Sequence, residues 1–118
     1  MTTQQVADRL VELCRQGKIE EAQIELFSQD ATSTEQMDFM GSKVVNGLDG
    51  IKKKGEMFNS AVEEFHGAEI SEPIIGGKYF SISWMLDATM KGRGRSKMEE
   101  ICVYKVEDGK IVSEEFFY

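Results

Sequence analysis

The stretch Lys97–Tyr118 constrains the fold more than any other part of the chain. Two runs rich in apolar residues, 98–106 and 111–118, flank the turn-forming sequence Glu107-Asp108-Gly109. An Asp-Gly pair between β-branched and aromatic residues is a strong signal for two antiparallel strands joined by a tight turn. The sequence therefore predicts a β-hairpin with a three-residue loop and Gly109 in the left-handed conformation.

The hairpin has two faces of different character, because side chains alternate along a strand. The predicted loop places Tyr104 opposite Val112 and Cys102 opposite Glu114. One face mixes carboxylates with aromatic rings, which suits a pocket wall; it carries Glu100, Cys102, Tyr104, Val112, Glu114, Phe116 and Tyr118. The other face carries Glu99, Ile101, Val103, Lys105, Ile111, Ser113, Glu115 and Phe117. Its apolar members require cover from another layer or a second subunit.

Length and charge narrow the class of protein. With 118 residues, the chain forms one domain, 1–118, with a single core. A formal net charge of −7 argues against nucleic-acid binding, which requires clustered Lys and Arg. We interpret the one basic cluster, Lys52-Lys53-Lys54, as a solvated helix face.

Targeting signals and ligand patterns are sparse in this sequence. No apolar run is long enough to span a bilayer, and the first residues lack the features of a secretory signal, so we expect no membrane partner and a cytoplasmic location. Cys14 and Cys102 show no metal-ligand spacing and are expected to be buried, reduced thiols. With one histidine, His66, and no glycine-rich loop after a strand, the sequence indicates no metal or nucleotide cofactor.

Apolar periodicity predicts three helices. The first covers 3–16 and stops at Gly17, and the second runs from Ile19 to near Phe27. The third starts after Asn46 or Gly47 and repeats apolar residues at spacings of three and four up to Phe65. His66 then directly follows a helix end.

The strand signals are uneven along the chain. Residues 30–35 predict a short strand, and 36–45 an irregular segment packed on the body. Residues 68–75 predict an edge strand weakened by Pro73, and 78–90 a long strand that ends in a basic turn, 91–95. The order predicts an α+β protein with three N-terminal helices on one face of a curved antiparallel sheet.

This order resembles the nuclear transport factor 2-like superfamily, and within it the SnoaL-like proteins. The residues that carry the resemblance are the helical pair followed by 27–32, the helix after Gly50, FSISWMLDATMKG and VYKVEDGKIVSEEFFY. The resemblance covers nearly the whole chain and implies a cone-shaped curved antiparallel sheet closed by helices. The superfamily includes ketosteroid isomerase, polyketide cyclases, dehydratases and non-catalytic binding or dimerisation modules, so the fold alone selects no activity.

The resemblance also implies positions for functional residues. Glu35 stands where the ketosteroid isomerase-like proteins place their general base. Cys102 stands where those proteins place a carboxylic acid that donates to the oxyanion; a thiol is a poor donor, and the first helix lacks their tyrosine. Cyclases of the SnoaL type use an acid on the strands, for which Asp87, Glu100 and Glu114 are the candidates.

The candidate chemistry is proton transfer, because a carboxylate in an apolar pocket has a pKa raised towards neutrality. Glu35, Glu100 or Glu114 would act as the base, Tyr104 or Tyr118 would orient a small hydrophobic ligand, and Trp84 and Phe116 would pack against it. The alternative for Glu100 and Glu114 is an exposed or structurally hydrogen-bonded surface carboxylate. Asp87 joins the inward acids only if the 91–95 turn sets an odd register.

Two function classes follow from these residues. The first is an acid/base isomerase, cyclase or dehydratase acting on a small hydrophobic molecule. The second is a non-catalytic ligand-binding or dimerisation module, in which fixed protein partners would satisfy the inward carboxylates. Either class is expected to be a homodimer that pairs through the outer sheet face.

Overall fold

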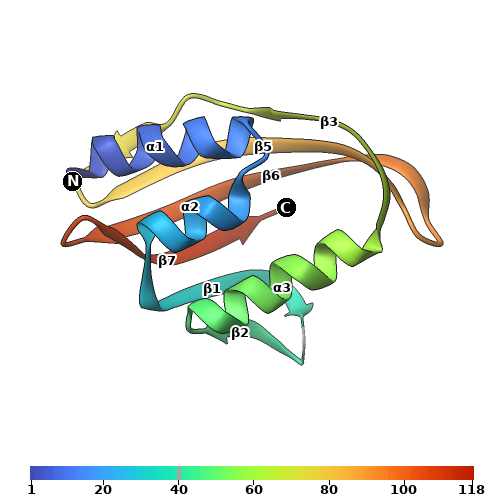
Figure 1. The fold of residues 1–118 in the computed structure, drawn as a ribbon, viewed down its shortest axis with the longest axis horizontal. Helices are drawn as coiled ribbons and strands as arrows, with labels where there is room; N and C mark the ends of the chain where they lie inside the picture. The colour runs from blue at the N-terminus through green and yellow to red at the C-terminus, as the bar shows by residue number, and fades with distance from the viewer. Residues whose placement is uncertain (40) are drawn as a thin grey trace.

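Three helices pack on a single curved sheet in the computed structural model, which describes residues 1–39 and 41–118 (Figure 1). The helices are α1 (Thr3–Arg15), α2 (Ile19–Leu26) and α3 (Leu48–Ala61). The strands in this described part are β1 (Phe27–Phe39), β2 (Ser42–Asn46), β3 (Val62–Ile70), β4 (Ile74–Gly76), β5 (Tyr79–Met90), β6 (Gly94–Glu107) and β7 (Lys110–Phe117). The expected α+β class is confirmed.

The sheet is mixed, whereas the sequence predicted a wholly antiparallel one. The strand order is β2-β1-β7-β6-β5-β3, and β4 pairs with β5 outside this path. The β1 and β7 strands run parallel, with Ser33 opposite Glu114, and the other neighbours are antiparallel. Parallel neighbours need a long crossover connection, which here is the remainder of the domain.

The first two helices form as predicted. Thr2 begins α1 with a capping box: its side chain accepts from the backbone N–H of Gln5, and the Gln5 side chain accepts from the backbone N–H of Thr2. Gly17, with φ of +76°, turns the chain out of the helix. The inward side chains of α1 are buried and belong to the main core: Val6, Ala7, Leu10, Val11, Leu13 and Cys14.

The third helix is shorter than predicted, because α3 ends at Ala61 and Val62–Ile70 is strand β3. The predicted extension to Phe65 is wrong. Val62 and Phe65 fit either a helical or an extended segment, and pairing with β5 opposite Met90 and Ala88 selects the strand. His66 therefore lies at a register shift in β3, where its Nε2 is 2.7 Å from Thr89 Oγ1, rather than at a helix end.

The segment predicted to be irregular, 36–45, is largely a second hairpin. β1 extends well past residue 35, and β2 pairs back onto it with Thr32 opposite Asn46 and Thr34 opposite Val44. Cross-strand pairing overrides the weak β-pattern of this polar stretch. Met40, which the prediction also included, lies outside the described residues.

The terminal hairpin is confirmed, but its register is different. The turn has two residues, Asp108 and Gly109, at φ of 51° and 74°, instead of three. A bulge at Val112 then shifts the pairing, so that Tyr104 opposes Glu114. The shift from the predicted register is two residues, which keeps the predicted pocket face together.

The bulge does move one residue to the other face. Ile111, predicted on the outer face, is fully buried, because it precedes the extra residue and pairs with Val106. The β5–β6 register is the even alternative: Trp84 opposes Glu100, and Asp87 opposes Lys97. Trp84 and Glu100 therefore share the face that the helices cover.

The core fills the end of this face that lies under α1 and α2. It includes Leu26, Phe27, Ala31, Phe80, Ile82, Cys102, Tyr104, Val106 and Ile111. Both cysteines are free and buried, as expected. In the part of the chain that the structure describes, no helix has the length and apolar character needed to cross a membrane.

Candidate functional site

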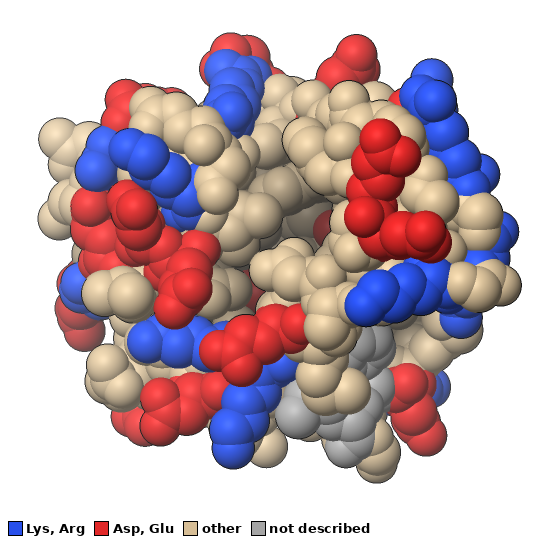
Figure 2. All heavy atoms as spheres, turned by 45° about the vertical axis from the view of Figure 1, so that its right-hand side comes forward, with Lys and Arg blue, Asp and Glu red and all other residues tan. Residues whose placement is uncertain are grey.

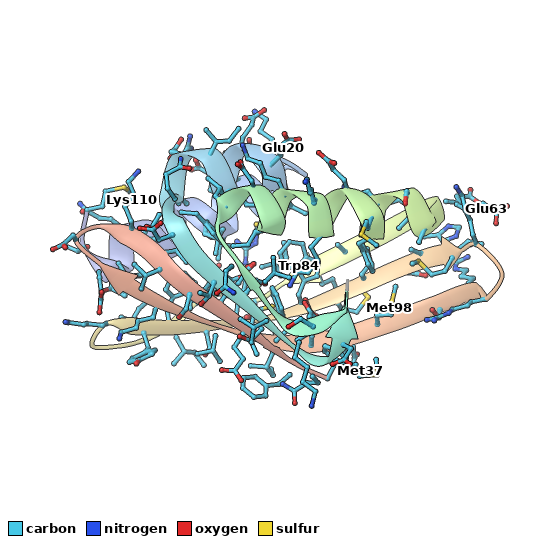
Figure 3. The ribbon with its side chains drawn as sticks, turned by 90° about the horizontal axis from the view of Figure 1, so that it is seen from below. Glu20, Met37, Glu63, Trp84, Met98 and Lys110 are labelled. Atoms are coloured by element: carbon cyan, nitrogen blue, oxygen red, sulfur yellow. The ribbon has the colours of Figure 1, made fainter. Side chains whose placement is uncertain are left out.

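The surface is hollowed at the end of the molecule that the core leaves unfilled. Figure 2 brings forward the side where α3 ends and β5 turns into β6, and it shows a depression with acidic atoms visible inside. Seen from below, the helices lie on one side of the sheet, and Trp84 and Met98 lie between α3 and the strands (Figure 3). A polar cluster lines this space.

The centre of the cluster is Lys54 of α3, which is only 8% exposed. Its Nζ donates to Glu35 Oε2 at 2.8 Å and to the hydroxyl of Ser33, both on β1. The ammonium also lies 5.0 Å from the ring centroid of Phe116, a cation–π distance. Lys54 belongs to the cluster predicted to be solvated, and for this residue that prediction is wrong.

Glu35 has fixed partners on both carboxylate oxygens. Oε2 accepts from Lys54, and Oε1 accepts from the Tyr118 hydroxyl at 3.0 Å. The Glu35 side chain is 15% exposed, whereas Tyr118 is largely exposed at the rim. Glu35, the candidate base suggested by resemblance, is therefore one member of an ion pair.

Glu114 of β7 lies behind this pair and is 5% exposed. Burial raises the pKa of Glu114 to about 7; the charge of Lys54 and a hydrogen bond with Ser33 oppose the rise, and the charges of Glu35 and Glu100 add to it. Near neutral pH, this carboxyl group can therefore both hold and release a proton.

Glu100 of β6 is half-buried and lies opposite Trp84, on the face of the sheet that the helices cover. Its Oε1 accepts a weak hydrogen bond from the Cys102 thiol, with a sulfur–oxygen distance of 3.5 Å. Burial raises the pKa of Glu100, the thiol and Lys54 oppose this, and Glu35 adds to it. Glu100 is thus an acid–base group without a strong protein partner among the described residues.

The remaining predicted residues divide between the core, the wall and a separate ion pair. Tyr104 is buried and stacks on Phe80 with ring centroids 4.8 Å apart, so it lies in the core. Phe116 is half-buried beside Lys54 and forms part of the wall. Asp87 is not brought to the cluster: it pairs with Arg95 at 3.0 and 3.1 Å, which lowers the pKa of Asp87.

Sequence reasoning missed Lys54 and Ser33. A signal for Lys54 exists: it lies three residues after Ile51 and six after Leu48, both in the core, and so continues the inward stripe of α3. Ser33 lies on the same face of β1 as Ala31 and Glu35, because side chains two residues apart in a strand point the same way. A serine in a polar strand nevertheless carries no distinctive sequence pattern. Among the described residues, no three His, Cys, Asp or Glu side chains are grouped so that they could hold a metal ion.

Fold and site together define an α+β protein with an acid-lined hollow at the open end of a curved sheet. The model of the SnoaL-like domain matches residues 1–118, and the chain belongs to this family. No curated protein matches the chain.

Solved structures agree with this assignment. A candidate SnoaL-like polyketide cyclase from Mesorhizobium loti is 31% identical, with all of both chains covered and a TM-score of 0.92. IdmH, a candidate polyketide cyclase from Streptomyces antibioticus, is 16% identical over 99% of this chain and 91% of that one, with a TM-score of 0.75. An NTF2-like protein from Anabaena variabilis is 15% identical over 98% and 87%, with a TM-score of 0.79. The last two likenesses concern the fold alone.

Proposed function

We propose that this protein binds a small, mostly apolar molecule in the hollow and transfers a proton on it, as an isomerase, cyclase or dehydratase does. Glu100 is the group that contacts the ligand. Glu114, which is more deeply buried, shares the transferred proton with Glu100. The observation that carries this proposal is the position of Glu100: half-buried, opposite Trp84, and held only by a weak thiol donor.

The walls support a ligand that is apolar over most of its surface. Trp84 and Phe116 present aromatic rings, and Met98 extends the apolar lining (Figure 3). A protonated carboxyl group in such a setting donates to a carbonyl or hydroxyl oxygen of the ligand, and an ionised one removes a proton next to a carbonyl. The description of the Mesorhizobium loti relative as a candidate SnoaL-like polyketide cyclase is consistent with a substrate of this class.

The test uses 2-tetralone, a small apolar ketone with exchangeable protons beside its carbonyl. Wild type should accelerate the exchange of these protons in D₂O, followed by proton NMR, and Glu100→Gln should lose about 100-fold or more of the rate while still binding the ketone. Glu99→Gln, an exposed neighbour on the opposite face, is the matched control and should behave like wild type. Equal rates for both variants would remove Glu100 from the mechanism.

The second candidate, a non-catalytic ligand-binding module, is favoured by one specific observation. Both oxygens of Glu35 are satisfied by Lys54 and Tyr118, which is the pattern expected of a carboxylate without a catalytic task. This candidate predicts that 2-tetralone or related ketones raise the melting temperature of wild type without any acceleration of exchange.

We also propose that the protein is a cytoplasmic homodimer that pairs through the outer sheet face. On that face, Ile101 and Phe117 are cross-strand partners and are 48% and 42% exposed, which leaves an apolar patch in water. The two reduced thiols support a cytoplasmic location. Ile101→Lys should convert a dimer to a folded monomer in light-scattering chromatography; a wild-type monomer would refute the pairing.

A further inference from the structure

The described contacts of the Lys54 ammonium are all with groups of the protein. Of the three N–H bonds of an ammonium, two donate to the Ser33 hydroxyl and the Glu35 carboxylate, and the ring centroid of Phe116 lies 5.0 Å from the nitrogen. The ammonium is therefore held mainly by protein groups. Its charge acts on the acidic side chains of the cluster, Glu100 and Glu114 included.

Those neighbours carry more negative than positive charge. The one buried cation of the described cluster has three carboxyl groups near it, those of Glu35, Glu100 and Glu114. Ionisation of all three beside a single ammonium is unfavourable, because like charges repel. Glu35 holds the direct 2.8 Å contact, so it is the carboxylate that the ammonium stabilises most. The other two carboxyl groups experience both the attraction of Lys54 and the repulsion of Glu35.

We propose that Lys54 is a positioning residue that holds Glu35 as a fixed anion and thereby leaves the mobile proton of the hollow to Glu100 and Glu114. This proposal rests on the proposed function and specifies which groups carry the proton. Glu35 then acts as a fixed charge that shifts the pKa values of the neighbouring carboxyl groups, and the ligand contacts the carboxyl group of Glu100.

The assignment predicts shifts of opposite sign at Glu114. The groups whose charge or hydrogen bonding reaches this carboxyl come from four elements: Ser33 and Glu35 of β1, Lys54 of α3, Glu100, Cys102 and Tyr104 of β6, and Cys14 of α1. Lys54→Met removes an attraction and should raise the pKa of Glu114 by about one unit. Glu35→Gln removes a repulsion and should lower this pKa by about one unit.

The measurement is an NMR titration of the ¹³C-labelled protein without ligand, with the Glu114 carboxyl signal identified by its loss in Glu114→Gln. The double variant Lys54→Met/Glu35→Gln should titrate closer to wild type than either single variant, because the two effects oppose. Lys53→Met, an exposed neighbour on the same helix, is the matched control and should leave the Glu114 titration unchanged. Lys54→Arg keeps the charge and should keep the Glu114 pKa near that of wild type.

A purely structural role for Lys54 predicts a different pattern. Both single variants would lose stability, and the Glu114 titration would stay unchanged or shift in the same direction in both, which would overturn the proposal. If Lys54→Met does not fold, Glu35→Gln decides alone: a lower Glu114 pKa supports the proposal, and an unchanged one refutes it. Because the titration needs no ligand, a negative result with 2-tetralone refutes the proposed activity and leaves this assignment standing, and the reverse also holds.

Discussion

The face of the sheet that the helices cover has two ends, which are built from the same strands but differ in how closely their side chains are packed. At the end under α1 and α2, Phe80, Ile82 and Cys102 are at most 2% exposed. A few residues further along the same strands, Trp84, Leu86 and Glu100 are only half-buried. The surface at this end of the molecule is hollowed (Figure 2). The alternation that places side chains on one face is identical at both ends, so it does not separate core from site.

The difference comes from the inward stripe of α3. Leu48 and Ile51 belong to the core, and the next inward residue is Lys54. A buried cation at this position needs polar partners, because apolar side chains alone would leave its charge unpaired. Lys54 donates hydrogen bonds to Ser33 and Glu35. The core therefore ends where α3 becomes charged, and the site begins there.

Matched truncations on β5 test most directly whether the two ends are packed differently. Ile82→Ala, in the packed end, should lower the free energy of unfolding by about 3–4 kcal/mol, because it leaves a cavity among buried side chains. Leu86→Ala, four residues later on the same face, should cost about 1–2 kcal/mol, because this side chain is already partly solvated. Urea denaturation measures both values, and equal losses would show that the hollowed end is packed like the core.

The pH dependence of stability is the second test. The pKa of Glu114 is about 7 in the folded state against 4.5 in the unfolded chain, so between these values the folded state binds more protons. Stability should therefore fall as pH rises from about 4.5 to 7, by about 3 kcal/mol in total. Glu114→Gln, which mimics the protonated group, should lose this slope in urea titrations at each pH.

The control for that prediction is Glu115→Gln, an exposed carboxylate on the same strand. It should keep the wild-type slope. A Glu114→Gln protein with an unchanged slope would mean that Glu114 is not the group responsible for this pH dependence.

The smallest expected effect concerns the rim. Tyr118→Phe removes the 3.0 Å hydrogen bond to Glu35. Because Tyr118 is 57% exposed and water can replace its hydroxyl, the free energy of unfolding should fall by only about 0.5 kcal/mol in urea denaturation. A loss above about 2 kcal/mol would show that the rim is as tightly determined as the packed end.

The sequence was sufficient for the fold class and for one wall of the hollow. The Asp108-Gly109 signal places the terminal hairpin, and the common facing of Glu100, Cys102, Glu114 and Phe116 holds although the register differs. The bulge at Val112 could not be predicted, because no local pattern specifies an extra residue in a strand. Val62 and Phe65 show the same limit, since their spacing fits a helix until pairing with β5 is known.

The opposite wall was harder to predict, because it depends on contacts between distant elements. Glu35 was identified as a candidate by resemblance, but its partner Lys54 was hidden in a run of three lysines. Only the position of Ile51 on the buried stripe distinguishes Lys54 from Lys53. The register of the β5–β6 turn likewise decided between Trp84 and Asp87 as the residue opposite Glu100.

The parallel pairing of β1 with β7 has a consequence for how the protein is made. Ser33 leaves the ribosome early and Glu114 late, so one edge of β1 has no neighbour during most of translation. Long-range pairing of this kind is slow to form, and an open strand edge invites association between nascent chains. The acid cluster is complete only when the last strand docks, so a chain that still lacks β7 has neither the pairing with β1 nor the carboxyl group of Glu114.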